Sequence, residues 1–265
     1  MNRLQTTLQS LKAQKKKALV AFLTAGYPDM KTTEELVLLF EKNGADIIEL
    51  GVPFSDPVAD GPTIQFSSEM ALRRGIHLTQ ILALVKKLRQ KTQIPIILMS
   101  YLNPLQRQGF AKMAAKARQC GVDGFIIPDL IPEESASLSR LCRGLDLSLI
   151  YLVAPNTPAA RLVTIDKKSD SFVYIVSILG VTGARATLPP SVKGYLHRTQ
   201  QCISHPRIIG FGISGPAQIL QLKQYVDGFI VASAFIDILR RTNGKKAQQR
   251  KLTDLLRSLR SALDN

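Results

Sequence analysis

The sequence has no tryptophan and little cysteine or histidine. The three cysteines are far apart and form no CxxC pair: Cys120, Cys142 and Cys202. Dispersed cysteines of odd number argue against a disulfide framework, so we expect free thiols. The three histidines show no HxH or HxxH spacing: His77, His197 and His205. We therefore expect exposed histidines, no metal site and no bound cofactor.

Long apolar runs are also missing. No stretch reaches the roughly 18 apolar residues that a membrane-spanning helix needs, so we expect no membrane partner. The first 17 residues contain basic side chains but no apolar stretch behind them, which is unlike a secretory signal. These absences predict a cytoplasmic protein.

Acidic residues are few beside basic ones: 20 Asp and Glu stand against 35 Lys and Arg, a net charge of +15. Nucleic-acid binding is one interpretation of such a balance. The basic residues are spread over helix-like stretches, however, with no interleaved aromatic residues and no nucleic-acid motif. We therefore expect no nucleic-acid partner. An anionic small molecule or an acidic protein surface fits the charge equally well.

Eight short apolar runs are present, and they alternate with helix-length segments. Most runs are continuously apolar rather than alternating, which is typical of parallel strands covered on both faces. The predicted strands are Ala18–Leu23, Ala45–Leu50, Ile94–Met99, Gly124–Pro128, Leu147–Leu152, Phe172–Ile178, Arg207–Phe211 and Gly228–Val231.

Helical patterns lie between most of these runs. They cover Leu4–Lys17, Thr33–Asn43, Leu78–Lys91, Phe110–Cys120, Glu133–Leu145, Pro158–Lys167, Pro216–Lys223 and Ala247–Leu263. Such alternation over 265 residues predicts an α/β protein, a (β/α)8 TIM barrel formed by one domain over residues 1–265. An open doubly wound sheet is the alternative, but no GxGxxG follows the first strand. Residues 1–17 predict an extra N-terminal helix at the barrel floor.

The second predicted strand ends in a carboxylate, Glu49. The loops after the strands form the active site of a barrel, so polar residues there are candidates for catalysis. Glu49 shares a face with Ile47 and opposes Ile48 and Leu50. Inside the barrel its pKa would rise and it would transfer protons near neutrality. The alternative is a Glu that faces a helix and pairs with a lysine.

The next loop carries Asp56 and Asp60 among several prolines and is long enough to fold over the barrel mouth. Two other chemistries found at barrel mouths lack their residues: no predicted strand contains a lysine that could form a Schiff base, and no ligand cluster fits a catalytic metal ion. Acid–base catalysis by carboxylates is the remaining possibility among these. Glycines after the sixth and seventh strands and Ser233 after the eighth are candidates for phosphate binding.

The segment from Glu49 to Gln65, ELGVPFSDPVADGPTIQ, is the most specific motif. AFLTAGYPD lies near the start of the chain, Gly-Val-Thr-Gly at 180–183, and Gly-Phe-Gly-Ile-Ser at 210–214. Together with Asp129 and Ala154-Pro-Asn156, these motifs strongly resemble the tryptophan synthase alpha chain family over nearly the whole sequence. The resemblance implies a lyase that splits indole-3-glycerol phosphate into indole and glyceraldehyde 3-phosphate.

The resemblance also implies roles for individual residues. Glu49 would protonate indole C3 and assist loss of the side-chain hydroxyl proton, while Asp60 would accept a hydrogen bond from the indole N–H. The apolar site for indole would comprise Phe22, Tyr101, Ile126, Leu152 and Tyr174, although plain barrel packing explains any one of them. The phosphate contacts would come from Thr182, Gly183, Gly212, Ser214, Ala232 and Ser233. We also expect Ser214 to cap the helix that follows it.

A partner is implied as well. The family passes indole to a pyridoxal-phosphate β subunit in an α2β2 assembly, and the residues facing it would be Asp56, Pro57, Asn103 and Pro104. This chain, which has no strand lysine, is expected to hold no pyridoxal phosphate.

Some positions depart from the family pattern. Ile178 and Leu179 replace a usual polar pair after the sixth strand, Ala232 stands where glycine is usual, and Pro128 replaces a small residue. The loop after strand six would cover Glu49, so its change bears on turnover. A second hypothesis is therefore a catalytically weakened chain that acts mainly as an activator and binding partner of the β subunit.

Overall fold

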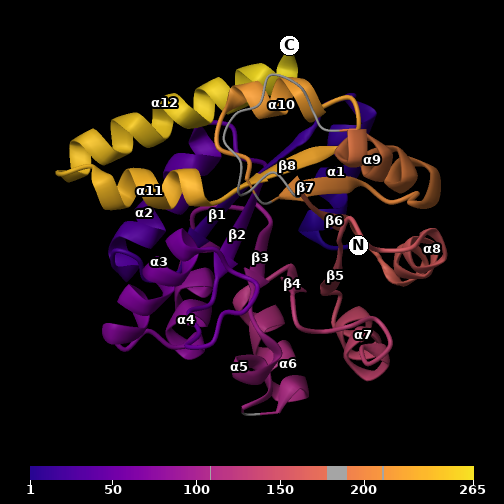
Figure 1. Cartoon of the computed structure of the whole chain (residues 1–265). Helices are drawn as coiled ribbons and strands as arrows, with labels where there is room; N and C mark the ends of the chain where they lie inside the picture. Colours follow the sequence, from indigo (N-terminus) through magenta and orange to yellow (C-terminus); the bar gives the residue numbers. More distant parts are fainter. Residues whose placement is uncertain (108, 178–189, 211) are drawn as a thin grey trace.

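A computed structural model describes residues 1–107, 109–177, 190–210 and 212–265, and it contains a closed barrel of parallel strands (Figure 1). Each strand pairs with its neighbours in chain order, and β8 returns to β1. The strands are β1 (Ala18–Thr24), β2 (Ile47–Gly51), β3 (Ile96–Met99), β4 (Gly124–Ile126), β5 (Ser148–Val153), β6 (Val173–Val176), β7 (Arg207–Gly210) and β8 (Gly228–Val231). The predicted (β/α)8 barrel is confirmed, and the open sheet was the wrong alternative.

The strands bury both faces, which explains their continuously apolar sequences. On β2, Ile47 belongs to the apolar cluster inside the barrel, whereas Ile48 and Leu50 belong to the cluster between strands and helices. The inner cluster also contains Val20 of β1 and Ile97 of β3. Alternate residues of each strand therefore point into the barrel.

Helices surround the strands (Figure 1). They are α1 (Arg3–Ala13), α2 (Met30–Lys42), α3 (Pro62–Arg73), α4 (Leu78–Leu88), α5 (Leu102–Gln106), α6 (Phe110–Cys120), α7 (Ala136–Gly144), α8 (Ala159–Lys168), α9 (Pro190–Cys202), α10 (Pro216–Leu222), α11 (Ser233–Arg241) and α12 (Lys245–Asp264). Local sequence sets several boundaries. Asp29 caps α2 by accepting the Thr32 N–H at 2.7 Å, and Gly121 ends α6 in the left-handed region.

The predicted N-terminal helix is α1, and it closes the barrel floor. Leu4, Leu8 and Leu11 recur on one face and pack against the inner cluster of the barrel. Asn2 and Gln5 form a reciprocal capping box at the start of the helix, with Asn2 Oδ1 accepting the Gln5 N–H at 3.0 Å.

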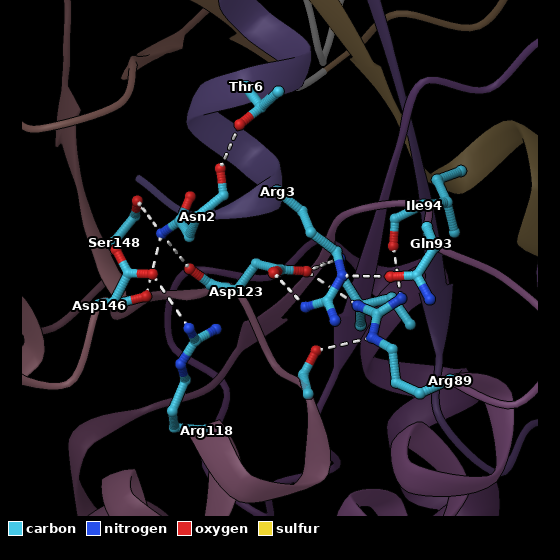
Figure 2. A network of polar contacts seen from close by, with 12 residues as sticks. Asn2, Arg3, Thr6, Arg89, Gln93, Ile94, Arg118, Asp123, Asp146 and Ser148 are labelled. Carbon is cyan, nitrogen blue, oxygen red and sulfur yellow. Dashed lines mark hydrogen bonds and ion pairs between the residues drawn. The ribbon is translucent and has the colours of Figure 1, made fainter.

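A polar network fixes the start of α1 to the floor (Figure 2). The Asp123 carboxylate is fully buried and is paired with Arg89 at 2.8 Å and Arg3 at 3.1 Å. The Asn2 side-chain amide donates to the Asp123 carbonyl and to the Ser148 hydroxyl, each at 3.1 Å. The network therefore joins α1 to the bases of β3, β4 and β5, with the buried carboxylate also accepting the Ile96 N–H of β3.

Candidate active site

Glu49 lies inside the barrel, near the carboxyl end of β2. It is paired in register with Phe22 of β1 and Ile97 of β3, and it shares the inward face with Ile47. Its side chain is buried, and within the described residues its Oε2 atom has no hydrogen-bond partner. The interpretation that Glu49 faces a helix and pairs with a lysine is wrong, because the alternation of β2 directs it inward.

Burial sets the protonation of this carboxyl group. Desolvation and, to a smaller extent, the charge of the nearby Asp60 carboxylate together raise the pKa of Glu49 to about 8. At neutral pH Glu49 is therefore largely a neutral carboxylic acid. It can donate a proton and then accept one, which an ordinary exposed glutamate does poorly.

Asp60 lies in the loop between β2 and α3, and Tyr101 fixes its surroundings. Partial burial raises the pKa of Asp60 and a hydrogen bond from the Tyr101 side chain opposes the rise, so that the pKa is about 6. The same Tyr101 hydroxyl accepts the Ala59 N–H at 2.9 Å. Tyr101 therefore connects the loop to the end of β3, and at neutral pH Asp60 is mostly ionised beside a mostly neutral Glu49.

The predicted indole-site residues come together at this end of the barrel. Ile126 and Tyr174 belong to the inner cluster, with Leu152 packed against it. Phe22 is buried next to Glu49 in the register, and Tyr101 packs on Phe54 with ring centroids 5.2 Å apart. Apolar side chains beside two carboxyl groups suit an aromatic ring with one N–H.

Gly210, at the end of β7, was predicted as part of the glycine-rich segment 210–214 for phosphate binding, but not as a residue that positions Tyr174. A Cβ atom there would lie 2.1 Å from the Tyr174 hydroxyl, so only glycine leaves room for the tyrosine ring. Burial raises the pKa of Tyr174, as do the charges of Glu49 and Asp60. The Tyr174 ring can therefore occupy this position only because residue 210 has no side chain. The only feature of the sequence that pointed to this role was a glycine at the end of a strand, and glycine is common in strand-to-helix turns.

The predicted phosphate residues lie after β7 and β8. Gly212 has a φ of 81°, in the left-handed region that favours glycine, whereas Ala232 has an ordinary φ of −128°. Ser233 begins α11, which has no side-chain cap. Thr182 and Gly183 lie outside the described residues, as do Ile178 and Leu179.

The prediction that Ser214 caps α10 is wrong. The helix starts after Gly215, and the Gln218 side chain accepts the Gly215 N–H at 2.9 Å and the Ser214 N–H at 3.3 Å. The Gln218 amide also donates to the Gly212 carbonyl at 3.1 Å. The long glutamine reaches back over the turn and takes the place of the shorter serine hydroxyl.

The predicted partner-facing residues lie on two adjacent segments. Asp56 and Asn103 are exposed, and Pro57 and Pro104 are partly exposed. Val58, which was not predicted, is 85% exposed, the largest exposed fraction of any large apolar side chain in the described ranges. The structural role of Asp129 was not predicted either. Its carboxylate accepts the Leu102 N–H at 2.9 Å and so fixes the start of α5.

One expectation about the histidines needs correction. His77 and His197 are exposed, but His205 is partly buried and its Nδ1 lies 2.8 Å from the Asp166 carboxylate. Its neighbour Ser204 donates to the other oxygen of Asp166 at 2.6 Å. Among the described residues no three His, Cys, Asp or Glu side chains are grouped as metal ligands, and no helix in these ranges is long and apolar enough to cross a membrane.

The fold and this site define a class. A closed parallel barrel that holds a neutral carboxylic acid beside an ionised one at the mouth is a barrel enzyme working by proton transfer. Comparisons with known proteins narrow the class. The family model described as tryptophan synthase alpha chain matches residues 8–264.

Individual relatives agree over their full lengths. The tryptophan synthase alpha chain of Geotalea daltonii is 43% identical over 263 residues, which is 99% of each chain. That of Geobacter sulfurreducens is 42% identical over 265 residues, which is 100% of each. A crystal structure of tryptophan synthase subunit alpha from Legionella pneumophila superposes with a TM-score of 0.92 at 38% identity, covering 100% of this chain and 99% of that one.

The chain belongs to the tryptophan synthase alpha chain family. It is a lyase of tryptophan biosynthesis, and the reaction of the alpha subunit is the cleavage of indole-3-glycerol phosphate to indole and glyceraldehyde 3-phosphate. The family partners the β subunit of tryptophan synthase. Similarity over the whole barrel favours this enzyme over the catalytically weakened activator.

Proposed function

We propose that Glu49 is the acid–base residue of this cleavage and that Asp60 assists it. The observation that carries the proposal is a buried carboxylic acid, without a hydrogen-bond partner at Oε2 in the described chain, on the inner face of β2. Its pKa of about 8 keeps it protonated at neutral pH, ready to act as an acid.

The reaction needs one proton delivered and one removed. Glu49 donates its proton to indole C3, which places a positive charge on the ring nitrogen. The side-chain hydroxyl next to C3 then loses its proton to the Glu49 carboxylate. The bond between C3 and the side chain breaks, its electron pair restores the indole ring, and the hydroxyl carbon becomes the aldehyde. Glu49 ends in its starting state.

Asp60 stabilises the charge that forms on the ring. An ionised carboxylate that accepts the indole N–H attracts the cation more strongly than the neutral substrate, which lowers the barrier. Its pKa of about 6 supports this role, because the group is mostly ionised at pH 7. The hydrogen bond from Tyr101 favours the same charged form.

The remaining predicted residues bind the rest of the substrate. Indole contacts the apolar set Phe22, Tyr101, Ile126, Leu152 and Tyr174, which lie on β1, after β3 and on β4, β5 and β6. The phosphate binds at Thr182, Gly183, Gly212, Ser214, Ala232 and Ser233, after β6, β7 and β8. To receive it, the Gly215 and Ser214 N–H groups exchange their bonds to Gln218 for bonds to phosphate.

The assembly is also a proposal. Asp56, Pro57, Asn103 and Pro104, together with the exposed Val58 that follows Pro57, form the face that docks on the β subunit in an α2β2 complex. Indole passes to that subunit in the cytoplasm. We also propose that residues 1–265 form one domain.

Steady-state cleavage of indole-3-glycerol phosphate, with the β subunit present, tests the catalytic assignment. We expect kcat/KM to fall below about pH 6, where Asp60 becomes protonated, and above about pH 8, where Glu49 ionises. Glu49→Gln should lower kcat by about 10²- to 10⁴-fold. Asp60→Asn should also move the alkaline limb to lower pH, because the Asp60 charge helps to raise the pKa of Glu49.

The matched control is Glu69→Gln, on the exposed surface of α3. It makes the same chemical change away from the site and should leave the profile unaltered. A Glu49→Gln enzyme with wild-type turnover would refute the assignment.

A further inference from the structure

A cavity lies at the opposite end of the barrel from the site described above. Its volume is about 330 Å³, and it opens between the end of α1 and the first residues of β1, β7 and β8. Leu8, Leu11, Ala18 and Pro206 form its apolar wall. This volume falls within the range of roughly 300–1,000 Å³ that small-molecule sites occupy.

Basic side chains dominate the rest of the wall. They are Lys12, Lys15, Lys16, Lys17 and Arg207, and the acidic residue among the lining side chains is Asp227. Arg207 already pairs with Asp227 at 2.9 Å and also donates its backbone N–H to it at 2.9 Å. Four lysines are therefore left without a neutralising carboxylate in the cavity wall.

Among the described residues, only one of the four lysines, Lys17, has a side-chain hydrogen-bond partner. The ammonium groups of Lys12, Lys15 and Lys16 form no ion pair with any described residue. Lys17 is half-buried and donates one hydrogen bond, to the Val226 carbonyl at 2.6 Å, which leaves two of its donors. Burial lowers the pKa of Lys17, and the nearby Arg207 and Lys223 charges add to this, while Asp227 opposes it.

The backbone at Lys15 has a strained conformation. Lys15 has a φ of 55°, in the left-handed region, at the position that follows the end of α1. The Lys15 N–H donates to the Lys12 carbonyl at 3.0 Å and the Lys16 N–H to the Leu11 carbonyl at 2.8 Å, the bond pattern of a helix end that favours glycine. A lysine is thus found where glycine would fit with less strain.

We propose that this cavity binds a small organic anion with two phosphate groups. Two phosphates carry about −3 to −4 charges at neutral pH, which matches the four uncompensated lysines, whereas one phosphate would neutralise about half of them. The apolar wall contacts the carbon skeleton between the phosphates. A second hollow shares Leu11 and Lys16 but is lined by Arg260 with Asp46 and Asp264, so its charges cancel.

Titration of the full chain with inorganic pyrophosphate, at about 0.15 M salt, tests the proposal. Amide chemical shifts report where it binds, since a phosphate site at the barrel mouth would respond separately. We expect shifts in residues 12–17, 207 and 227, and at least about tenfold weaker binding of inorganic phosphate at these residues. Shifts confined to the loops at the mouth would overturn the proposal.

The double variant Lys15→Gly/Lys16→Gln separates binding from folding. It should weaken pyrophosphate binding at the floor by about tenfold or more. Its Tm should not fall, because glycine adopts the left-handed conformation of residue 15 more readily than lysine does. Pyrophosphate binding that survives unchanged in this variant contradicts the proposed site.

The control is Lys112→Gln/Lys116→Gln, which removes the same charge from the exposed face of α6. It should leave pyrophosphate binding unchanged, and an equal loss would mean that only net charge matters. A single-stranded oligonucleotide that perturbs residues 12–17 at lower concentration than pyrophosphate would overturn the small-molecule proposal in favour of a nucleic-acid surface.

Discussion

At the scale of single residues, the proposed chemistry depends on one buried acid. Glu49 is surrounded by apolar strand residues, and no ion pair compensates its charge among the described residues. The surroundings therefore favour the neutral form, which serves catalysis but costs stability once the unfolded chain can ionise.

This cost depends on pH. The pKa of Glu49 is about 8 in the folded chain and about 4.5 in the unfolded one, so stability that is fully present below about pH 4.5 is lost as the pH rises toward 8. Glu49→Gln removes the titration. We expect the stability of the variant relative to wild type to increase by roughly 3 kcal/mol between about pH 5 and pH 8. Urea unfolding at both pH values measures it, and a pH-independent difference would contradict the raised pKa.

Gly210→Ala tests the close approach of Tyr174. The added Cβ would lie 2.1 Å from the tyrosine hydroxyl, so the buried ring must move. We expect a stability loss of about 1–3 kcal/mol and a lower kcat/KM for indole-3-glycerol phosphate. Gly194→Ala, in α9, is the matched control because its Cβ would meet nothing within 4 Å, and it should be neutral or slightly stabilising. Similar losses in both variants would argue against a specific clash.

At the scale of elements, the strands were easier to predict than the helices. Continuous apolar runs identified all eight strands, with ends displaced by a few residues. Strands that are buried on both faces have continuously apolar sequences, which can be recognised from local composition. Four helices were missed: α3, α5, α9 and α11. Proline at the start of α3, the shortness of α5 and the polar composition of α9 obscured their patterns, and neighbouring elements stabilise them.

Arg89→Met tests how the floor network joins these elements. It leaves the fully buried Asp123 with one ion-pair partner, Arg3, and with the Ile96 N–H as a hydrogen-bond donor, and we expect a loss of about 3 kcal/mol in the free energy of unfolding. Arg73→Met breaks an ion pair of 2.6 Å between exposed side chains and should cost at most about 1 kcal/mol. Chemical denaturation compares the two, and equal losses would mean that the network adds nothing beyond surface charge.

At the scale of the whole molecule, the two ends of the barrel differ. The mouth holds the carboxyl groups and the exposed loop around Val58, while the floor is covered by α1 and lined by lysines. Strand direction causes this separation, because parallel strands place all following loops at one end.

Val58→Asp tests the docking face. Val58 is 85% exposed and directly follows the predicted partner residues Asp56 and Pro57, so a charge there should weaken association with the β subunit by at least about tenfold. Leu220→Asp is the control, since Leu220 is 54% exposed but lies on α10. Sedimentation or calorimetry with purified β subunit measures the affinity. Unchanged binding by Val58→Asp, or an equal loss in the control, would place the interface elsewhere.

The sequence by itself determined the barrel, the N-terminal helix and the family, because strand burial and the Glu49–Gln65 motif are local properties of the chain. Only the tertiary structure decided that Glu49 points inward, that Tyr101 holds the Asp60 loop and that Gly210 makes room for Tyr174. It likewise brought Lys12–Lys17 beside Arg207. These relations join residues far apart in the chain, and they follow from strand register and closure of the barrel, which no local pattern encodes.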